Sequence, residues 1–280
     1  MRILCLHGVG SNGSICESQL QPFIRASDPS YEFIFVDGPE PCERGPGTVK
    51  TDQNDPQRMA AYHDGPFYSH TRAYDPQSMQ AAIEHLEEVI DEMGPFNGVL
   101  GFSQGAALTI SFLHQQASKP LPFKFALCFS SVIPCSADAA VCDNLIDRIC
   151  PLDGSDAASE EQKLFSELLE QTVIPAQQHN SMLPDYDISI YRGDQGLLQA
   201  PRLMPPSLTK EKIRIPTVHM TGKRDASFMR SMSKAALGLC EKGSFKVLEH
   251  SGGHELPKSP ADVKAAVRAM EWAIGRMAHL

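Results

Sequence analysis

A serine, an aspartate and a histidine occur along the chain in the order and setting that nucleophilic catalysis needs. Ser103 is the centre of GFSQG (Gly101 to Gly105), a G-x-S-x-G pattern between a short apolar run and a helical pattern. A serine on so sharp a turn adopts a strained backbone, and its neighbours must be small so that strand and helix can approach each other. The turn would hold the Ser103 hydroxyl above a sheet as a nucleophile. The alternative is that Ser103 only caps the helix.

The candidates for the acid and the base follow two later apolar runs. A serine hydroxyl is a weak nucleophile, so it needs a base and a group that orients the base. Asp225 comes just after the run in IPTVHMTGKRD, and His254 follows the run and the glycine turn in KVLEHSGGHELP. We predict Ser103, Asp225 and His254 as the catalytic residues, in the order nucleophile, acid, base. The alternatives are Asp225 as a helix cap and His250 as the base, although His250 lies nearer the strand end and lacks the preceding glycine turn.

The stretch GVGSNG (Gly8 to Gly13) has two interpretations. It matches G-x-G-x-x-G after an apolar run, and Asp37 ends the next run, as expected of a dinucleotide-binding site. It also follows His7, and a His-Gly pair after an early strand is typical of the loop that donates a backbone N–H group to an oxyanion. We favour the oxyanion interpretation, because the nicotinamide-binding alternative leaves GFSQG, Asp225 and His254 unexplained.

Two backbone N–H groups stabilise the oxyanion of acyl transfer. The amide of Gln104 stands directly after the nucleophile, at the beginning of the predicted helix. The second amide would come from the loop that follows His7-Gly8. We predict Val9 and Gln104 as the oxyanion-hole donors, with Gly10 as the alternative to Val9.

Alternating strand and helix patterns must position these residues. Short apolar runs predict six strands, at Arg2–His7, Tyr31–Val36, Gly98–Phe102, Phe123–Phe129, Ile215–Thr221 and Phe245–Glu249. Helical spacing and capping residues predict helices over residues 75–94, 159–173 and 259–277. The alternation indicates an α/β fold, with a mostly parallel sheet of about six strands and helices on both faces.

Two long stretches interrupt what we expect to be a single domain, residues 1–280. Residues 38–74 predict a loop insertion, and residues 136–211 predict a cap-like insertion that serves as a lid or a binding loop. Aromatic and apolar residues in these stretches would either line an apolar pocket or anchor the loops: Tyr62, Phe67, Tyr68, Met182, Leu197, Leu198, Leu203 and Met204.

Composition excludes several classes of protein. The net charge of -9 argues against nucleic acid and an anionic membrane as partners, since both need clustered basic residues. No apolar run approaches the roughly 20 residues that span a bilayer, and the N-terminus has no charged-then-apolar leader. We therefore expect a cytoplasmic protein.

Neither the cysteines nor the histidines form a metal-binding pattern. None of the eight cysteines is in a C-x-x-C pair, and several lie in apolar runs, so we expect reduced, structural thiols. His250 and His254 are four apart, but the two glycines of HSGGH disfavour the helix that a paired metal site needs. We expect no metal and no cofactor.

The motifs together resemble a known family. LCLHG followed by NG, then GFSQGAAL, HMTGKRD and HSGGHELP, occur in this order between residues 3 and 257. They are similar to the family of serine hydrolases, common in fungi, known as FSH-type hydrolases. The resemblance implies a compact α/β-hydrolase whose sheet begins at or near the strand before the His-Gly loop. It carries the triad onto Ser103, Asp225 and His254, and the oxyanion donors onto Val9 and Gln104.

The resemblance also implies a substrate class. Members of the family in fungal secondary-metabolite pathways act as esterases or thioesterases, and some release polyketide chains from an acyl carrier protein. We therefore expect hydrolysis of a small-molecule ester or thioester through an acyl-enzyme, with an acyl carrier protein as a candidate partner. Small-ester hydrolysis and C–C bond hydrolysis on the same triad are the alternatives, and a nicotinamide-binding oxidoreductase is the remote one.

Overall fold

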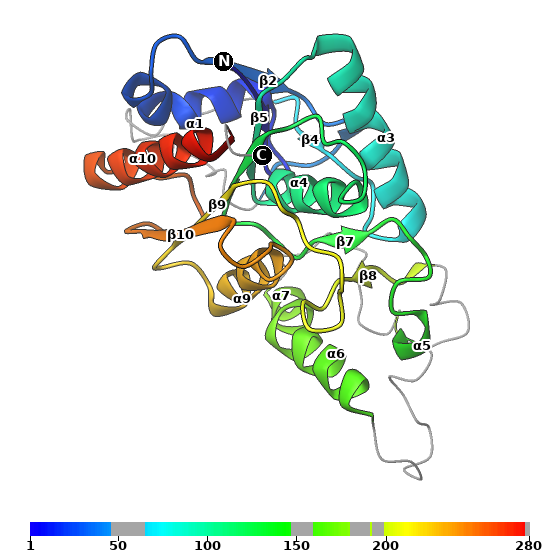
Figure 1. Cartoon of the computed structure of the whole chain (residues 1–280). Coiled ribbons are helices and arrows are strands. Elements are labelled where there is room, and N and C mark those ends of the chain that lie inside the picture. The colour runs from blue at the N-terminus through cyan, green and yellow to red at the C-terminus, as the bar shows by residue number, and fades with distance from the viewer. Residues whose placement is uncertain (46–64, 147–158, 180–190, 192–198, 278–280) are drawn as a thin grey trace.

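The computed structural model describes residues 1–45, 65–146, 159–179, 191 and 199–277. Six strands form one parallel sheet in the order β10-β9-β6-β5-β1-β2 (Figure 1). They are β1 (Arg2–Leu6), β2 (Glu32–Val36), β5 (Gly98–Phe102), β6 (Phe125–Phe129), β9 (Thr217–Gly222) and β10 (Phe245–His250). All six predicted strands are confirmed. The four inner strands are mostly buried, and a strand buried on both faces is a nearly continuous apolar run that the sequence displays directly.

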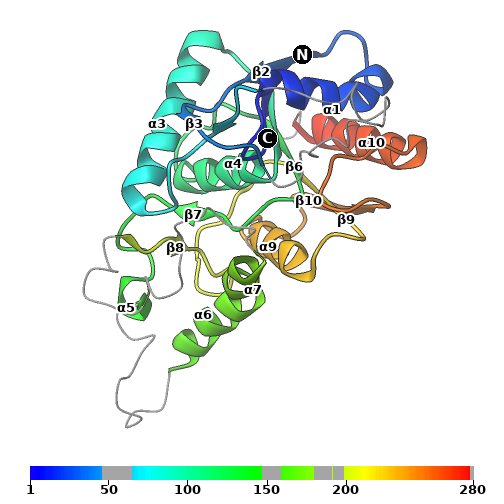
Figure 2. The ribbon, with the colours of Figure 1, turned by 180° about the vertical axis from the view of Figure 1, so that it is seen from behind.

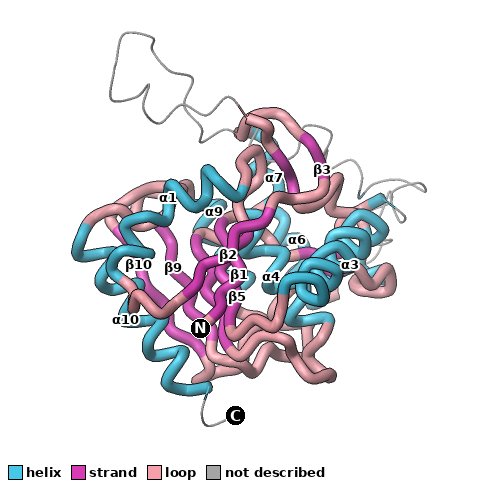
Figure 3. Tube along the Cα trace, turned by 90° about the horizontal axis from the view of Figure 1, so that it is seen from above, coloured by secondary structure: helices cyan, strands magenta, loops and turns pink. Residues whose placement is uncertain are grey.

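Each inner strand presents alternate side chains to two apolar clusters. Ile3 and Cys5 of β1 belong to one cluster, whereas Leu4 and Leu6 belong to the other. The first cluster includes side chains of α1 (Gly13–Ala26) and α10 (Pro260–Met277). The second includes side chains of α3 (Pro76–Met93), α4 (Gln104–Gln115) and α9 (Ser227–Leu237). Helices therefore cover both faces, with α1 and α10 on one side of the strands and α3 and α4 on the other (Figure 3).

The helix ends follow their capping residues. The Asp75 side chain accepts a hydrogen bond from the Ser78 amide at 3.0 Å, and Gly94 is the C-cap of α3. At α10, the Asp262 amide donates to Ser259 Oγ at 3.2 Å. These contacts satisfy amides that the first turn of a helix leaves without partners, which is why the sequence predicted both helix starts.

The order of the strands creates a switch point beside β1. The chain moves from β1 to β2 on one side and later places β5 on the other side. Because all six strands are parallel, the loops after β1, β5, β9 and β10 gather at one edge of the sheet. In open α/β sheets a ligand site lies at this edge, next to the switch point.

The described parts of the two expected insertions form small sheets and short helices. β3 (Glu40–Pro41) pairs with β4 (Tyr68–Ser69), and β7 (Cys135–Ser136) pairs with β8 (Arg202–Leu203). Between β7 and β8 lie α5 (Asp143–Ile146), α6 (Glu160–Gln171) and α7 (Val173–Gln178). Both α6 and α7 contact α9, and α7 lies next to α9 in Figure 2. The predicted helix over residues 159–173 is thus α6, with α7 as a continuation that the pattern did not predict.

A buried arginine joins the early and late parts of the second insertion. Arg202 is 2% exposed, and its guanidinium donates to Asp143 Oδ1 at 2.7 Å and to the Ala139 carbonyl at 2.8 Å. The neighbouring Leu203 and Met204 are 1% exposed and belong to the core cluster on the α4 face. These two apolar residues therefore anchor the insertion, which is one of the two roles expected of them.

The remaining pocket candidates divide between two regions. Phe67 packs under the guanidinium of Arg44, 4.7 Å from the ring centroid, and Tyr68 belongs to β4. Tyr62, Met182, Leu197 and Leu198 lie outside the described residues.

None of the helices in the described part of the chain combines the length and the apolar character that crossing a bilayer requires.

Candidate active site

The turn between β5 and α4 holds Ser103 in a strained backbone conformation. Its φ of 52° and ψ of -111° lie in a region that L-residues other than glycine rarely adopt. Ser103 occupies the N-cap position of α4, yet its side chain makes no capping hydrogen bond. The helix-cap alternative is therefore wrong, and the hydroxyl is directed elsewhere.

The small residues around Ser103 allow strand and helix to meet. A Cβ atom on Gly101 would lie 2.5 Å from the Cα of Ala106, inside α4. A Cβ atom on Gly105 would lie 2.4 Å from the Leu6 carbonyl oxygen at the end of β1. Real Cβ atoms do not approach other atoms so closely, so both glycines are required by contact.

The hydroxyl of Ser103 is directed at His254, which in turn contacts Asp225. Ser103 Oγ lies 2.9 Å from His254 Nε2, and His254 Nδ1 lies 2.8 Å from Asp225 Oδ2. A neutral imidazole that donates from Nδ1 to the carboxylate leaves Nε2 to accept from the serine hydroxyl. The structure thus brings together the three residues predicted as nucleophile, base and acid, in the geometry that the triad needs.

The two alternatives for the acid and base do not fit this geometry. The N-cap residue of α9 is Ala226, and Asp225 directs its second oxygen, Oδ1, to the amide of Ala226 at 2.8 Å. His250 is 1% exposed, and its Nδ1 accepts a hydrogen bond from the Gly252 amide at 3.1 Å. Burial lowers the pKa of His250. His250 therefore shapes the loop that carries His254, the predicted base.

The loops that carry the acid and the base are joined to each other. The amide of Lys223 donates to the His250 carbonyl, and the amide of Arg224 donates to the Gly252 carbonyl, both at 2.9 Å. Ser251 donates from its amide and its hydroxyl to Asp262 in the first turn of α10, at 3.1 Å and 2.6 Å. These bonds hold the imidazole and the carboxylate at a fixed separation.

The loop after β1 lies directly against the nucleophile. A Cβ atom on Gly8 would be 3.3 Å from Ser103 Cβ, so the chain passes beside the serine just before Val9. The Gly10 amide donates to the Tyr68 carbonyl at 3.0 Å, so Gly10, the alternative to Val9, already has an acceptor in the protein. Within the described residues, neither the Val9 amide nor the Gln104 amide donates to a protein acceptor. The two predicted oxyanion donors are therefore available to a ligand.

The amides that a dinucleotide would need are already occupied by the chain's own side chains. At the beginning of α1, the Gly13 amide donates to Asp37 Oδ1 at 2.7 Å, and the Ile15 amide donates to Asn12 Oδ1 at 2.8 Å. A pyrophosphate there would meet the carboxylate of Asp37 at close range. Asp37 is thus a capping residue of α1, and this contact contradicts the nicotinamide interpretation.

Sequence reasoning missed the segment that supports Gln104. Residues 69–74 contact the buried Gln104 side chain through Ser69, His70 and Tyr74. A tyrosine, a serine and a histidine in a loop match no catalytic motif, so only the three-dimensional contacts identify them.

In the described part of the chain, no three His, Cys, Asp or Glu side chains form a group that could hold a metal.

The fold and the site together define a serine hydrolase of the α/β-hydrolase class. The chain matches the family described as Serine hydrolase (FSH1) over residues 1–266 and therefore belongs to this family. Esterase alnB of Emericella nidulans is 34% identical over 98% of this chain and 96% of its own length. Esterase FPY3 of Fusarium mangiferae is 30% identical, over 97% of this chain and 95% of its own.

A solved structure supports the fold. SOBER1 of Arabidopsis thaliana has a TM-score of 0.50 with 16% sequence identity, over 98% of this chain and 99% of that one. At this identity the likeness concerns the fold alone. The family membership confirms the resemblance drawn from the motifs, and the protein is a serine hydrolase of the esterase type.

Proposed function

We propose that the protein hydrolyses an ester or thioester through an acyl-enzyme on Ser103. The observation that carries this proposal is the continuous hydrogen-bonded chain from Asp225 through His254 to Ser103, at 2.8 Å and 2.9 Å. His254 accepts the hydroxyl proton as Ser103 attacks the carbonyl, and Asp225 stabilises the imidazolium that forms. The same imidazolium then gives the proton to the leaving alcohol or thiol.

The amides of Val9 and Gln104 complete the mechanism. They donate hydrogen bonds to the carbonyl oxygen as it becomes an oxyanion, and Gln104 does so from the N-terminus of α4, where the helix dipole favours negative charge. Water, activated by His254, then attacks the acyl-enzyme and releases the acid. The energetic advantage lies in the fixed positions of the donors before the reaction begins.

The acyl donor of first choice is a thioester carried by an acyl carrier protein. This part of the proposal rests on the family resemblance, in which some members release polyketide chains from carriers. A small ester is the nearest rival, and cleavage of a C–C bond is possible chemistry for the same three residues. We further propose that residues 136–211 act as a cap on a single domain spanning residues 1–280.

The compartment follows from the state of the cysteines. The seven described cysteines all carry free thiols, and five of them are buried: Cys5, Cys16, Cys128, Cys135 and Cys240. Free buried thiols are usual in a reducing compartment. We therefore propose that the protein works in the cytoplasm.

Steady-state kinetics of three variants tests the triad. Ser103→Ala and His254→Ala should each lower kcat for p-nitrophenyl butyrate by about 10⁴-fold or more, because nucleophile and base act as a unit. The control Ser118→Ala removes an exposed serine in the turn after α4 and should match wild type. An Ser103→Ala variant with near-wild-type turnover would contradict the assignment.

Parallel assays separate the acyl donors. Butyryl-pantetheine, butyryl carrier protein, p-nitrophenyl butyrate and a β-diketone present the thioester, the carrier, the ester and the C–C bond in turn. A carrier-bound thioester should give the highest kcat/KM. Preference for the free ester, or turnover of the diketone alone, would overturn the carrier part of the proposal and leave the triad in place.

A further inference from the structure

One short segment contacts both parts of the candidate oxyanion hole, namely the loop that carries Val9 and the helix start that carries Gln104. We call residues 68–74 the brace segment. The Tyr68 carbonyl accepts from the Gly10 amide at 3.0 Å, and the Tyr68 amide donates to the Ser11 carbonyl at 2.7 Å. The segment is thereby hydrogen-bonded to the loop that carries Val9. Its other contacts are to Gln104, at the start of α4.

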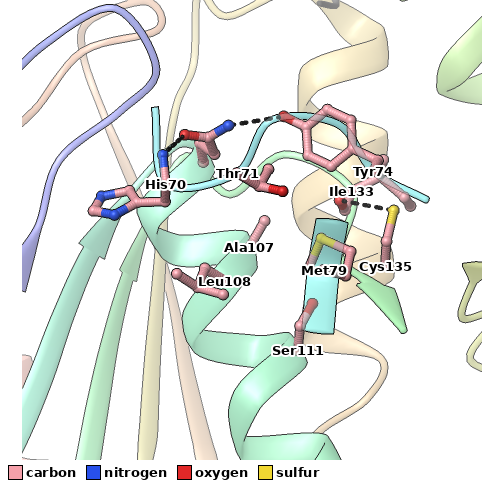
Figure 4. Close-up of a pocket in the computed structure, with 10 residues that line it drawn as sticks. His70, Thr71, Tyr74, Met79, Ala107, Leu108, Ser111, Ile133 and Cys135 are labelled. Atoms are coloured by element: carbon pink, nitrogen blue, oxygen red, sulfur yellow. Dashed lines mark hydrogen bonds between the residues drawn. The ribbon is translucent and has the colours of Figure 1, made fainter. Parts of the chain in front are cut away.

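The Gln104 side chain is held entirely by the brace segment. It is 2% exposed, and its Oε1 accepts a hydrogen bond from the His70 amide at 2.9 Å. Its Nε2 donates to Ser69 Oγ at 2.9 Å and to Tyr74 Oη at 3.4 Å. Figure 4 shows His70 and Tyr74, with dashed lines for their hydrogen bonds to this side chain. Because the side chain is fixed on both polar atoms, the backbone of Gln104 is fixed with it.

The ring of His70 contacts the loop that carries Val9, the other candidate oxyanion donor. Its Nε2 lies 3.1 Å from the His7 carbonyl oxygen, and the two imidazole centroids are 4.3 Å apart. The same carbonyl accepts from the Gly105 amide at 3.1 Å. His7 in turn donates from Nδ1 to the Gly8 carbonyl at 2.7 Å and accepts the Gly38 amide at Nε2. The His7-Gly8 backbone is therefore set by contacts on both of its sides.

The protonation state of His70 suits this contact. The ring is 3% exposed, and burial, together with the neighbouring His7, holds the pKa of His70 well below its ordinary value. A neutral imidazole carries one ring N–H, and the contact with a carbonyl oxygen places it on Nε2. His70 thus donates one backbone and one ring hydrogen bond, each to a different half of the hole.

The space beside the brace segment is too small to bind substrate. A cavity of about 10 Å³ is lined by His70 and Tyr74 of the brace segment, by residues of α3 and α4 that include Gln104 and Ser111, and by Ile133 and Cys135 (Figure 4). Such a volume admits a single water-sized group at most. The segment therefore supports Gln104 by close packing.

We propose that His70 is a positioning residue that holds the Val9 and Gln104 amides at the separation required by the oxyanion. The proposal rests on the proposed function, because it takes these two amides as the oxyanion donors. Removal of a donor from an oxyanion hole costs about 10²- to 10³-fold in kcat. A substitution of His70 would displace the two donors without removing them, so kcat should fall by less than this. The displacement should affect the transition state more than the bound substrate.

Three substitutions in the full-length protein test the proposal. His70→Leu removes the ring N–H and keeps the backbone amide, whereas His70→Gln restores a side-chain N–H near the position of Nε2. His85→Leu is the control, because His85 is a part-exposed histidine on α3 whose Nδ1 lies 3.8 Å from Glu88 Oε2. For each variant we would measure kcat and KM for p-nitrophenyl butyrate, active sites by fluorophosphonate titration, and Ki for a trifluoromethyl ketone, whose serine adduct carries an oxyanion.

The expected result is a loss of transition-state stabilisation at the oxyanion, with substrate binding almost unchanged. His70→Leu should lower kcat per titrated site by about 10- to 100-fold, change KM by less than about twofold, and raise Ki for the ketone in proportion to the loss of kcat. His70→Gln should recover most of the loss, and His85→Leu should match wild type. If His70→Leu does not fold, His70→Gln and Ser69→Ala carry the test, with a smaller shift of the same kind.

Two results would overturn the proposal in distinguishable ways. Wild-type kcat and Ki per titrated site in His70→Leu, with only a lower melting temperature, would show a purely structural role and leave the proposed function intact. A wild-type enzyme that neither hydrolyses esters nor takes up the fluorophosphonate would overturn the proposed function and this inference with it.

Discussion

At the scale of single residues, the proposed nucleophile Ser103 is held in a strained backbone conformation. Its φ of 52° is unfavourable for a residue with a Cβ atom, and the strained turn is what aims Oγ at His254. The surrounding glycines hold this conformation by close contact with α4 and β1. The strain therefore belongs to the mechanism, and it should be measurable as a loss of stability.

We predict that Ser103→Gly is more stable than Ser103→Ala, although both are inactive. Glycine adopts positive φ without steric cost, so the substitution relieves strain of about 1–3 kcal/mol, partly offset by about 0.5–1 kcal/mol of extra chain entropy. The net gain should be about 1 kcal/mol. Urea unfolding of the two variants measures it. Equal stabilities, or a more stable alanine variant, would show that the turn is not strained.

Residue types and spacing predicted the triad because each member follows a visible strand. Ser103, Asp225 and His254 stand at the ends of apolar runs, where a side chain on a loop is directed to the sheet edge. His70 has no such signal, because its partners are distant in the sequence and two of its contacts use backbone atoms. Asp37 gave a misleading signal, since a carboxylate that follows β2 and caps the distant start of α1 occupies the sequence position expected of one that binds a ribose.

At the scale of elements, the packing of α4 against β1 decides whether the nucleophile is presented. The contact depends on Gly105, where a Cβ atom would collide with the Leu6 and His7 carbonyl oxygens at 2.4 Å and 2.7 Å. No rotation of a side chain can relieve a clash between a Cβ atom and backbone. The helix must move, and the Gln104 amide must move with it.

We predict that Gly105→Ala lowers the free energy of unfolding by about 3 kcal/mol and removes most of the esterase activity. Gly275→Ala in α10 is the matched control, because nothing lies within 4 Å of the added atom. There the same substitution should stabilise the protein by about 0.5–1 kcal/mol, since alanine favours the helix. Denaturant unfolding and ester hydrolysis report both. A harmless Gly105→Ala would contradict the close approach of α4 and β1.

Asp262 links the loop of the base to α10, and this link should depend on pH. Hydrogen bonds from Ser251 and Ser259 lower the pKa of Asp262 from 3.8 to about 2. A carboxylate whose pKa falls on folding stabilises the folded state above its unfolded pKa, and the contribution is lost as the pH falls through the folded pKa. The relevant window therefore lies between pH 3.8 and about 2.

Asp262→Asn should lower the free energy of unfolding at pH 7 by about 1 kcal/mol, a value reduced for the solvent around this exposed carboxylate. The difference from wild type should shrink as the pH falls from 4 toward 2, because the wild-type carboxyl then becomes neutral as well. Urea unfolding at a series of pH values measures the difference. A gap that stays constant down to the acid limit would show that the charge of Asp262 does not contribute.

Elements with a pattern of their own were predictable, and elements made by tertiary contact were not. The six strands and the helices α3 and α10 show apolar periodicity and capping residues, so their ends were predicted closely. The strands β3, β4, β7 and β8 have two residues each, which is too short for any periodicity. They exist because distant segments pair, as Glu40 does with Ser69 and Cys135 with Leu203.

At the scale of the whole molecule, the parallel sheet gathers the separate parts of the site at one edge. The loops after β1, β5, β9 and β10 carry the proposed oxyanion amides and the proposed nucleophile, acid and base. The strands pair in register from Ile3 with Gly98 to His250 with Gly222, so the strand ends are held level. This arrangement explains how residues separated by 151 positions, as Ser103 and His254 are, form one hydrogen bond.

Intact-mass spectrometry with a fluorophosphonate probe tests the central claim most directly. A serine activated by the His254–Asp225 pair should take up one equivalent of probe, and peptide mapping should place it on Ser103. Ser103→Ala should take up none, and His254→Ala should react far more slowly. Failure of the folded wild-type protein to react, or labelling at another serine with Ser103 unmodified, would contradict the account.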